Sequence, residues 1–209
     1  MIDVVIGSSL AAAAGLNAWM PLFLLGLAAR LVPAVSLPAG WSWLSSDVAL
    51  WIIGILLVLE IVADKIPALD TVNDIVHSII RPAAGGIAFG AGTAARTVAV
   101  DDPGTFFSEH TWIPVVSGIA IALVVHIVKA TGRIAANTAT VGVAAPVLST
   151  GEDLASFALS VSAILVPLLA AALLIALIAT VVVAVRRRTR RRRRAQADAG
   201  ADQAGRVQT

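Results

Sequence analysis

The ionisable residues of one short segment are the strongest candidates for chemistry in this chain. Residues 60–82 read EIVADKIPALDTVNDIVHSIIRP, and long apolar stretches flank them. The ionisable members are Glu60, Asp64, Lys65, Asp70, Asp74, His77 and Arg81. Carboxylates beside a histidine and cations are suited to binding a cation or passing a proton. We therefore expect a polar site where two helices meet.

Glu60 matters most, because it directly follows the apolar run WIIGILLVL. A carboxylate inside a membrane span costs about 2.5 kcal/mol or more, so it usually faces a partner or a water-filled cavity. The alternative is an acid at the end of a helix, paired with Lys65 at the headgroup level, and this interpretation is favoured for Asp64. His126 lies at the corresponding place in another apolar run. It is either the proton-relay partner of Glu60 or a buried histidine bonded to a backbone carbonyl.

Helical spacing places the other candidates on two faces. At 100° per residue, four polar residues of 70–81 share one face, and four more share a face at the end of a later span. These sets are Asp70, Asp74, His77 and Arg81, and then His126, Lys129, Arg133 and Asn137. Each face is either part of an ion or substrate site, or a surface that reaches water or lipid phosphates.

Enzymatic patterns are not evident. The chain has no cysteine and no G-x-S-x-G, H-E-x-x-H or phosphate-binding glycine loop. Its acids and histidines could surround a divalent ion, but their spacing matches no metal motif. We therefore predict no catalytic residue and no cofactor, and leave the metal open.

The composition predicts an all-α, polytopic membrane protein. The 209 residues are 58% hydrophobic and 13% charged, with a mean hydropathy of +0.91. A soluble domain is nearer one quarter charged. The length allows five or six helices of about 20 residues in a bilayer. We expect a transmembrane domain over 1–185 and an Arg-rich, disordered tail over 186–209.

One or two of the spans should be broken. Asn17, in GLNAWMP, marks one expected break, and its backbone is a candidate for lining the site. The expected helices are a broken one over 4–32, a span over 48–63, an amphipathic helix over 70–81 capped by Asp70 and ended by Pro82, a span over 83–99, one over 112–128 and one over 154–185 bent at Pro167. Residues 134–148 either cross as a sixth span, which we favour, or form a surface loop or re-entrant segment. STGED (149–153) should start the last helix.

Charge predicts the orientation. The side with Lys65, Arg81, Lys129 and Arg133 should be cytoplasmic, and the side with the acidic loops and Trp41, Trp43 and Trp112 should not. The run RRRTRRRRR should hold the C-terminus to the anionic inner surface of the plasma membrane. Its lipid contacts would be Arg186, Arg187, Arg188, Arg190 and Arg191. Nucleic acid is a poor partner, because no aromatic residues are interleaved.

Two patterns concern packing. Gly86, Gly90 and Ala94 form a small-residue stripe that lets helices approach closely, and it predicts a homo-oligomer through Gly86 and Gly90. DTVNDI (70–75) and STGEDL (149–154) are alike, which suggests a duplicated helical hairpin.

Several motifs also resemble a known family. GLNAWMPLFLLGLAAR, EIVADKIPALD, HSIIRP and KATGRIAAN with a later GED are similar to bacterial membrane proteins of the domain of unknown function 4126 family. The resemblance reaches to about residue 180 and excludes the Arg-rich tail. It implies an integral membrane protein without an established activity, and a more loop-like segment near 138–148.

Three functions remain open at this point. The leading hypothesis is a small transporter or channel for an unidentified solute or ion, with Glu60 binding the cation or proton. The alternative is a non-catalytic scaffold that binds lipid headgroups or a partner protein. An enzyme acting on a lipid phosphate comes third, since it lacks an evident nucleophile.

Overall fold

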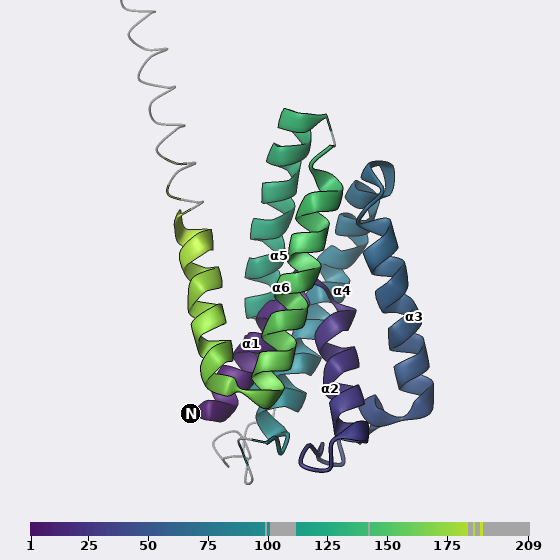
Figure 1. Ribbon diagram of the computed structural model, residues 1–209, viewed down its shortest axis with the longest axis vertical. Helices are drawn as coiled ribbons and strands as arrows, with labels where there is room; N and C mark the ends of the chain where they lie inside the picture. The colour runs from purple at the N-terminus through teal and green to yellow at the C-terminus, as the bar shows by residue number, and fades with distance from the viewer. Residues whose placement is uncertain (99, 101–111, 142, 184–185, 187–188, 190–209) are drawn as a thin grey trace, which may run out of the picture. The chain divides into compact units, whose positions relative to one another are not determined.

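The chain folds into helices, and no strand occurs among the residues described here. The computed structural model describes residues 1–98, 100, 112–141, 143–183, 186 and 189, and only the backbone of 67–72. The elements are α1 (Ile2–Leu16), α2 (Trp19–Leu31), the 3-10 helix η1 (Ser42–Ser45), α3 (Asp47–Ala63), α4 (Pro67–Ala94), α5 (Trp112–Thr140), α6 (Ala145–Leu165) and a further helix, Pro167–Val183 (Figure 1). Two compact units, Met1–Leu173 and Leu174–Thr209, divide the chain. The first unit holds every contact described below.

Helices α1 and α2 form a hairpin that turns at Asn17. The backbone there is extended (φ −142°, ψ 119°), so the helix predicted over 4–32 is indeed broken. Gly15 lies against Val125 of α5, and Gly7 lies against Thr93 near the end of α4. In α2, Gly26 instead contacts Leu44, just before α3. The hairpin therefore enters the bundle and returns to the end from which it came (Figure 1).

Helices α3 to α6 alternate in direction around this hairpin, and α4 differs from its prediction. It runs unbroken through Pro82, so the separate helices expected over 70–81 and 83–99 are wrong. Its N-cap is Ile66, with Pro67 in the first turn, not Asp70. Proline fits a first turn because it lacks the N–H that has no partner there.

Two further boundaries also differ. Residues 134–148 form no helix of their own, because α5 continues to Thr140 and α6 begins at Ala145. The sixth span favoured for this segment is therefore wrong, and so is a helix start at STGED. The chain also breaks at Val166 (φ −142°, ψ 74°), so 154–185 is two helices where one bent span was expected. Pro167 cannot donate the next helical hydrogen bond, which explains the break.

Glycines let α1, α4 and α5 approach closely. A Cβ on Gly85 would lie 2.7 Å from the Gly118 carbonyl oxygen of α5 and would overlap Ala122. Gly86 and Gly90 face α5 and Trp41 of the same chain. The small-residue stripe thus packs inside this chain, and its role in an oligomer stays a prediction, as does the helical-hairpin repeat.

Besides an apolar core, the described chain buries several charged side chains and exposes many large apolar ones. Charged side chains such as Arg81 and Glu60 are 0% and 2% exposed, whereas Trp51, Ile55 and Val58 of α3 are more than half exposed. Large exposed apolar patches mark surfaces that contact lipid or partners. Among the described residues, one helix, Trp112–Thr140, is long and apolar enough to cross a membrane. Three more are apolar but shorter: Ile2–Leu16, Trp19–Leu31 and Pro167–Val183.

Candidate functional site: a charge cluster at the tip of the helical hairpin

The tip of the α1–α2 hairpin meets a group of ionisable side chains from four helices, here called the charge cluster. Most of its members were predicted from the sequence, and the structure brings them together. They are Glu60, Asp64, Lys65, Asp74, His77, Arg81, His126, Lys129, Arg133, Glu152 and Asp153. Most are buried, so each charge must be balanced within the chain.

Glu60 lies in the last turn of α3 and binds the hairpin directly. The Ala18 N–H donates to its two carboxylate oxygens at 3.3 and 3.0 Å. This N–H is free because α1 has ended at Leu16 and α2 starts at Trp19. Arg81 of α4 donates to Glu60 Oε1 from Nη2 at 2.9 Å and from Nε at 3.3 Å. Glu60 therefore has an arginine partner, not the Lys65 of the alternative interpretation.

Arg81 connects three helices. Besides Glu60, its Nη1 donates to Asp74 at 3.2 Å and to His126 Nδ1 at 2.9 Å. Its side chain is fully buried, so its positive charge would destabilise the fold if these carboxylates were absent. The helical spacing that placed Asp74, His77 and Arg81 on one face is confirmed, and this face points inward.

The two buried histidines have different tautomers, which their partners define. Arg81 can only donate, so His126 Nδ1 accepts and its Nε2–H donates to Ser78 Oγ at 3.1 Å. His126 is thus fully bonded as a neutral ring. His77 Nδ1 must donate to the Asn73 carbonyl at 2.9 Å. Its Nε2 has no hydrogen bond and lies 3.4 Å from Glu60 Oε1.

This arrangement corrects the predicted partner of Glu60. His77 approaches the carboxylate from α4, whereas His126 contacts Arg81 and Ser78 instead. His77 Nε2 therefore lies close to the carboxylate without a hydrogen bond to it, and a positive charge on the ring would be attracted to Glu60.

Asp64, just after α3, is held by cations of α5. Its Oδ2 lies 3.1 Å from both Lys129 Nζ and Arg133 Nη2, and 3.5 Å from Arg81 Nη2. Asn73 donates to its other oxygen. Burial by itself raises the pKa of Asp64, but the three cations outweigh burial and lower the pKa to about 2. Asp64 is therefore ionised at neutral pH.

Helix α6 completes the cluster with two acids. Glu152 pairs with Arg133 and lies 3.2 Å from Lys129. Asp153 accepts from Lys65 Nζ and from Asn17 Nδ2, both at 3.0 Å. Because α6 begins at Ala145, these acids lie about two turns inside the helix, not in the first turn where the sequence placed them.

Side chains hydrogen-bond to the backbone at the end of α1 and at the start of α2. Asn17 Oδ1 accepts from the N–H groups of Trp19 and Met20 at 3.2 and 3.0 Å, so it caps α2. Lys129 Nζ donates to the Leu16 carbonyl at 2.7 Å and so closes the end of α1. The hairpin tip is held by the same residues that hold the charges.

Comparison with known proteins agrees with the motifs noted in the sequence. A model of the family described as Domain of unknown function (DUF4126) matches residues 4–187. The chain belongs to the DUF4126 family. No curated protein and no solved structure matches it. The match takes in every member of the charge cluster and ends at the start of the arginine run.

Most of the remaining predicted site residues of this DUF4126 chain have side chains outside the described part of the structure. Asp70 is in α4, but its side chain is outside the described part, as are Arg187, Arg188, Arg190 and Arg191. Arg186 is exposed. Among the described residues, no three His, Cys, Asp or Glu side chains are grouped as metal ligands.

Several contributors escaped the sequence analysis of this DUF4126 chain. Ser78 and Asn73 orient the histidines, and the Ala18 N–H binds Glu60. Glu152 and Asp153 were noticed but assigned to a helix start. Two acids well inside a helix would have indicated a buried polar site. This signal was not visible in the sequence, because it depends on the start of α6 at Ala145.

Proposed function

We propose that this chain is a small multi-pass protein of the bacterial plasma membrane that works as a transporter, with a proton bound between Glu60 and His77 as its coupling ion. The observation that carries the proposal is the 3.4 Å approach of His77 Nε2, which has no hydrogen bond, to the buried Glu60 carboxylate. A buried carboxylate and an imidazole nitrogen without a hydrogen bond are neighbours there, and a proton on the ring would attract the carboxylate.

The charge balance of the cluster supports the same site. Its described side chains include five carboxylates and four lysine or arginine cations. With both histidines neutral, these described side chains would carry one net negative charge. A proton on His77 balances it, whereas His126 already has both ring nitrogens bonded.

The position of the proposed proton site, at the tip of the α1–α2 hairpin, supports a role in transport. Broken helices whose free backbone groups meet ionisable side chains are a recurring feature of secondary transporters. Here Ala18 N–H binds the carboxylate of the site, and Leu16 C=O binds Lys129. Gain or loss of one proton changes the attraction between Glu60, His77 and Arg81, so it would bias the hairpin between two positions. His77 contacts Glu60 of α3 directly. Arg81 links Glu60 to Asp64, to Asp74 of α4 and to His126 of α5, and Lys129 of α5 pairs with Asp64.

The membrane arrangement follows from helix lengths. Helices α1 and α2 are about 22 and 20 Å long, too short for a hydrocarbon core of about 30 Å, so they form a re-entrant hairpin. The crossings would be α3, α4, α5, α6 and Pro167–Val183. We place the end with Lys65 in the cytoplasm, and the same charge rule assigns the Arg-rich run to the cytoplasm as well.

A non-catalytic scaffold is the second candidate. It is favoured by the pairing of nearly all cluster charges within the chain, which a purely structural network would also show. The same pairing disfavours an enzyme that binds a lipid phosphate, because Arg81, Lys129 and Arg133 are engaged with carboxylates.

Proton uptake into vesicles tests the proposal. The full chain is reconstituted in liposomes that contain a pH-sensitive dye, an acid-outside gradient is imposed and a potassium ionophore clamps the potential, with and without mixtures of solutes. We expect acidification by the wild type and at least a tenfold slower rate for Glu60→Gln and His77→Gln. His126→Gln is the matched control and should keep most of the rate.

Two results would count against the proposal. Wild-type vesicles that acidify no faster than empty ones would exclude proton movement under these gradients and favour the scaffold. Equal rates for His77→Gln and the wild type would remove the proposed site. Elution as one species in size-exclusion chromatography shows that each variant has folded.

A further inference from the structure

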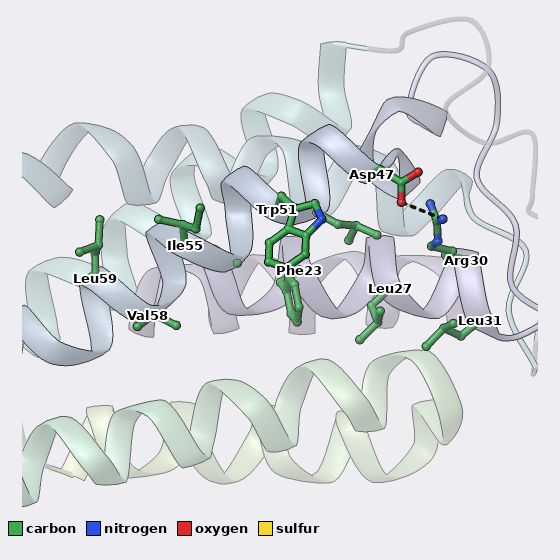
Figure 2. Close-up of a pocket in the computed structure, with 11 residues that line it drawn as sticks. Phe23, Leu27, Arg30, Leu31, Asp47, Trp51, Ile55, Val58 and Leu59 are labelled. Carbon is green, nitrogen blue, oxygen red and sulfur yellow. Dashed lines mark ion pairs between the residues drawn. The ribbon is translucent and has the colours of Figure 1, made fainter.

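A groove lies between α2 and α3, and no member of the charge cluster lines it. Its volume is about 550 Å³, within the range of small-molecule sites. Apart from one ion pair its lining is apolar, and it comprises Phe23, Leu27, Leu31, Leu50, Trp51, Gly54, Ile55, Val58 and Leu59. Figure 2 shows these side chains along the two helices, with Arg30 and Asp47 at one end.

The groove extends along most of α3. Its lining on α3 extends from Asp47 to Leu59, which is about 18 Å along the helix. A groove of this length along a membrane-crossing helix is long enough to hold an extended stretch of acyl chain. An acyl chain that enters at the interface would therefore follow the groove to its far end.

An exposed ion pair lies at the mouth of the groove. Arg30 Nη2 lies 2.7 Å from Asp47 Oδ1, and their side chains are 42% and 73% exposed. Arg30 Nη1 also donates to the Ser45 carbonyl at 3.3 Å. The guanidinium has five N–H groups, so donors remain for a phosphate, and Asp47 offers a carboxylate to an amine beside it.

We infer that this groove binds one phospholipid with an amine-bearing headgroup, phosphatidylethanolamine. Arg30 binds the phosphate, Asp47 binds the ammonium, and one acyl chain lies between Leu27 and Ile55. The inference rests on the membrane location given in the proposed function, but not on the proton site. Trp41 and Trp43 lie in the segment that connects α2 to α3, at the same end as Arg30 and Asp47. Tryptophan is enriched at membrane–water interfaces, which agrees with a headgroup at this end.

Native mass spectrometry of the full chain tests the inference. The protein is purified in a mild detergent and titrated with phosphatidylethanolamine or phosphatidylglycerol of identical acyl chains. We expect one retained phosphatidylethanolamine per chain, with at least tenfold less phosphatidylglycerol. Ile55→Trp fills the groove and should lower retention at least tenfold. Ile79→Trp adds the same side chain to an exposed position of α4 outside the groove and should not.

Substitutions of Arg30 and Asp47 test the headgroup contacts separately from the groove, and both side chains are exposed. Arg30→Gln should lower retention of both lipids, whereas Asp47→Asn should remove only the preference for the amine. Preference for phosphatidylglycerol, or equal retention of both lipids, would overturn the headgroup assignment. Equal loss in Ile55→Trp and Ile79→Trp would overturn the groove, as would a lipid-free dimer that Ile55→Trp disrupts. Loss of proton uptake in Glu60→Gln with unchanged lipid retention would separate the two sites.

Discussion

Arg81 Nη2 lies 2.9 Å from Glu60 Oε1, and neither side chain reaches solvent. One residue comes from α4 and the other from α3, and the Ala18 N–H of the hairpin binds the same carboxylate. Removal of one partner from such a pair leaves an uncompensated buried charge, which is costlier than loss of the pair itself. The pair is therefore a point where helix packing and charge balance depend on each other.

This dependence predicts the stability of a double variant. Arg81→Gln should lower the free energy of unfolding by about 3–5 kcal/mol, because Glu60 then stays charged without its cation. Arg81→Gln with Glu60→Gln should recover part of that loss. Thermal unfolding in detergent would measure both. If the double variant loses as much stability as Arg81→Gln and Glu60→Gln lose together, the two residues do not depend on each other and the prediction is wrong.

The break at Asn17 predicts an unusual order of substitutions. Asn17→Ala removes the cap of α2 and should cost about 1 kcal/mol or more. Serine keeps the acceptor and should cost less. Aspartate is as good a cap, yet Asn17→Asp would place a second carboxylate beside Asp153, now 3.0 Å from the amide. Unfolding in detergent should therefore rank Asp below Ser. The reverse order would show that the Asp153 contact contributes little.

Contact between α4 and α5 predicts that Gly85 does not tolerate a methyl group. Its Cβ would overlap Ala122 and lie 2.7 Å from the Gly118 carbonyl oxygen, so Gly85→Ala should separate the helices and destabilise the fold by about 1–3 kcal/mol.

Gly132 is the matched control, because nothing lies within 4 Å of its Cβ position in α5. Gly132→Ala should stabilise the helix by about 0.5–1 kcal/mol. Melting temperatures that shift in opposite directions would agree with both expectations. A stable Gly85→Ala would mean that the two helices are farther apart than described.

The charges around Asp64 predict acid sensitivity. Its pKa is lowered from 3.8 to about 2 in the folded chain, so its contribution to stability is complete above about pH 4 and lost as the pH falls toward 2. The loss is on the order of 2–3 kcal/mol. Unfolding measured from pH 6 to 2 should show it. Asp64→Asn should be less stable at pH 6 and flatter below pH 4, and a parallel profile would exclude Asp64 as the source.

Local patterns determined much of this architecture from the sequence alone. The spacing of Asp74, His77 and Arg81 placed them on one face, and the spacing of His126, Lys129 and Arg133 did the same in α5. The break at Asn17 was also visible, because glycine, asparagine and proline cluster there. These features depend on residues within about three turns of one another, and helix geometry relates such residues directly.

Other features depended on neighbours distant in the sequence. Pro82 looked like a helix end, but packing of Gly85 against α5 keeps α4 continuous, since tertiary contacts outweigh local propensity. The start of α6 at Ala145 was missed in the same way, and with it the roles of Glu152 and Asp153.

The sequence by itself determined which residues are ionisable, which helical face each occupies, and that an apolar chain must bury them. Only the tertiary structure decided that His77, and not His126, faces Glu60, and that Arg81 lies between Glu60 and His126. The reason is physical: the two histidines are equally plausible on their own helices. Their partners are chosen by the rotation and depth at which α3, α4 and α5 pack, which no local pattern encodes.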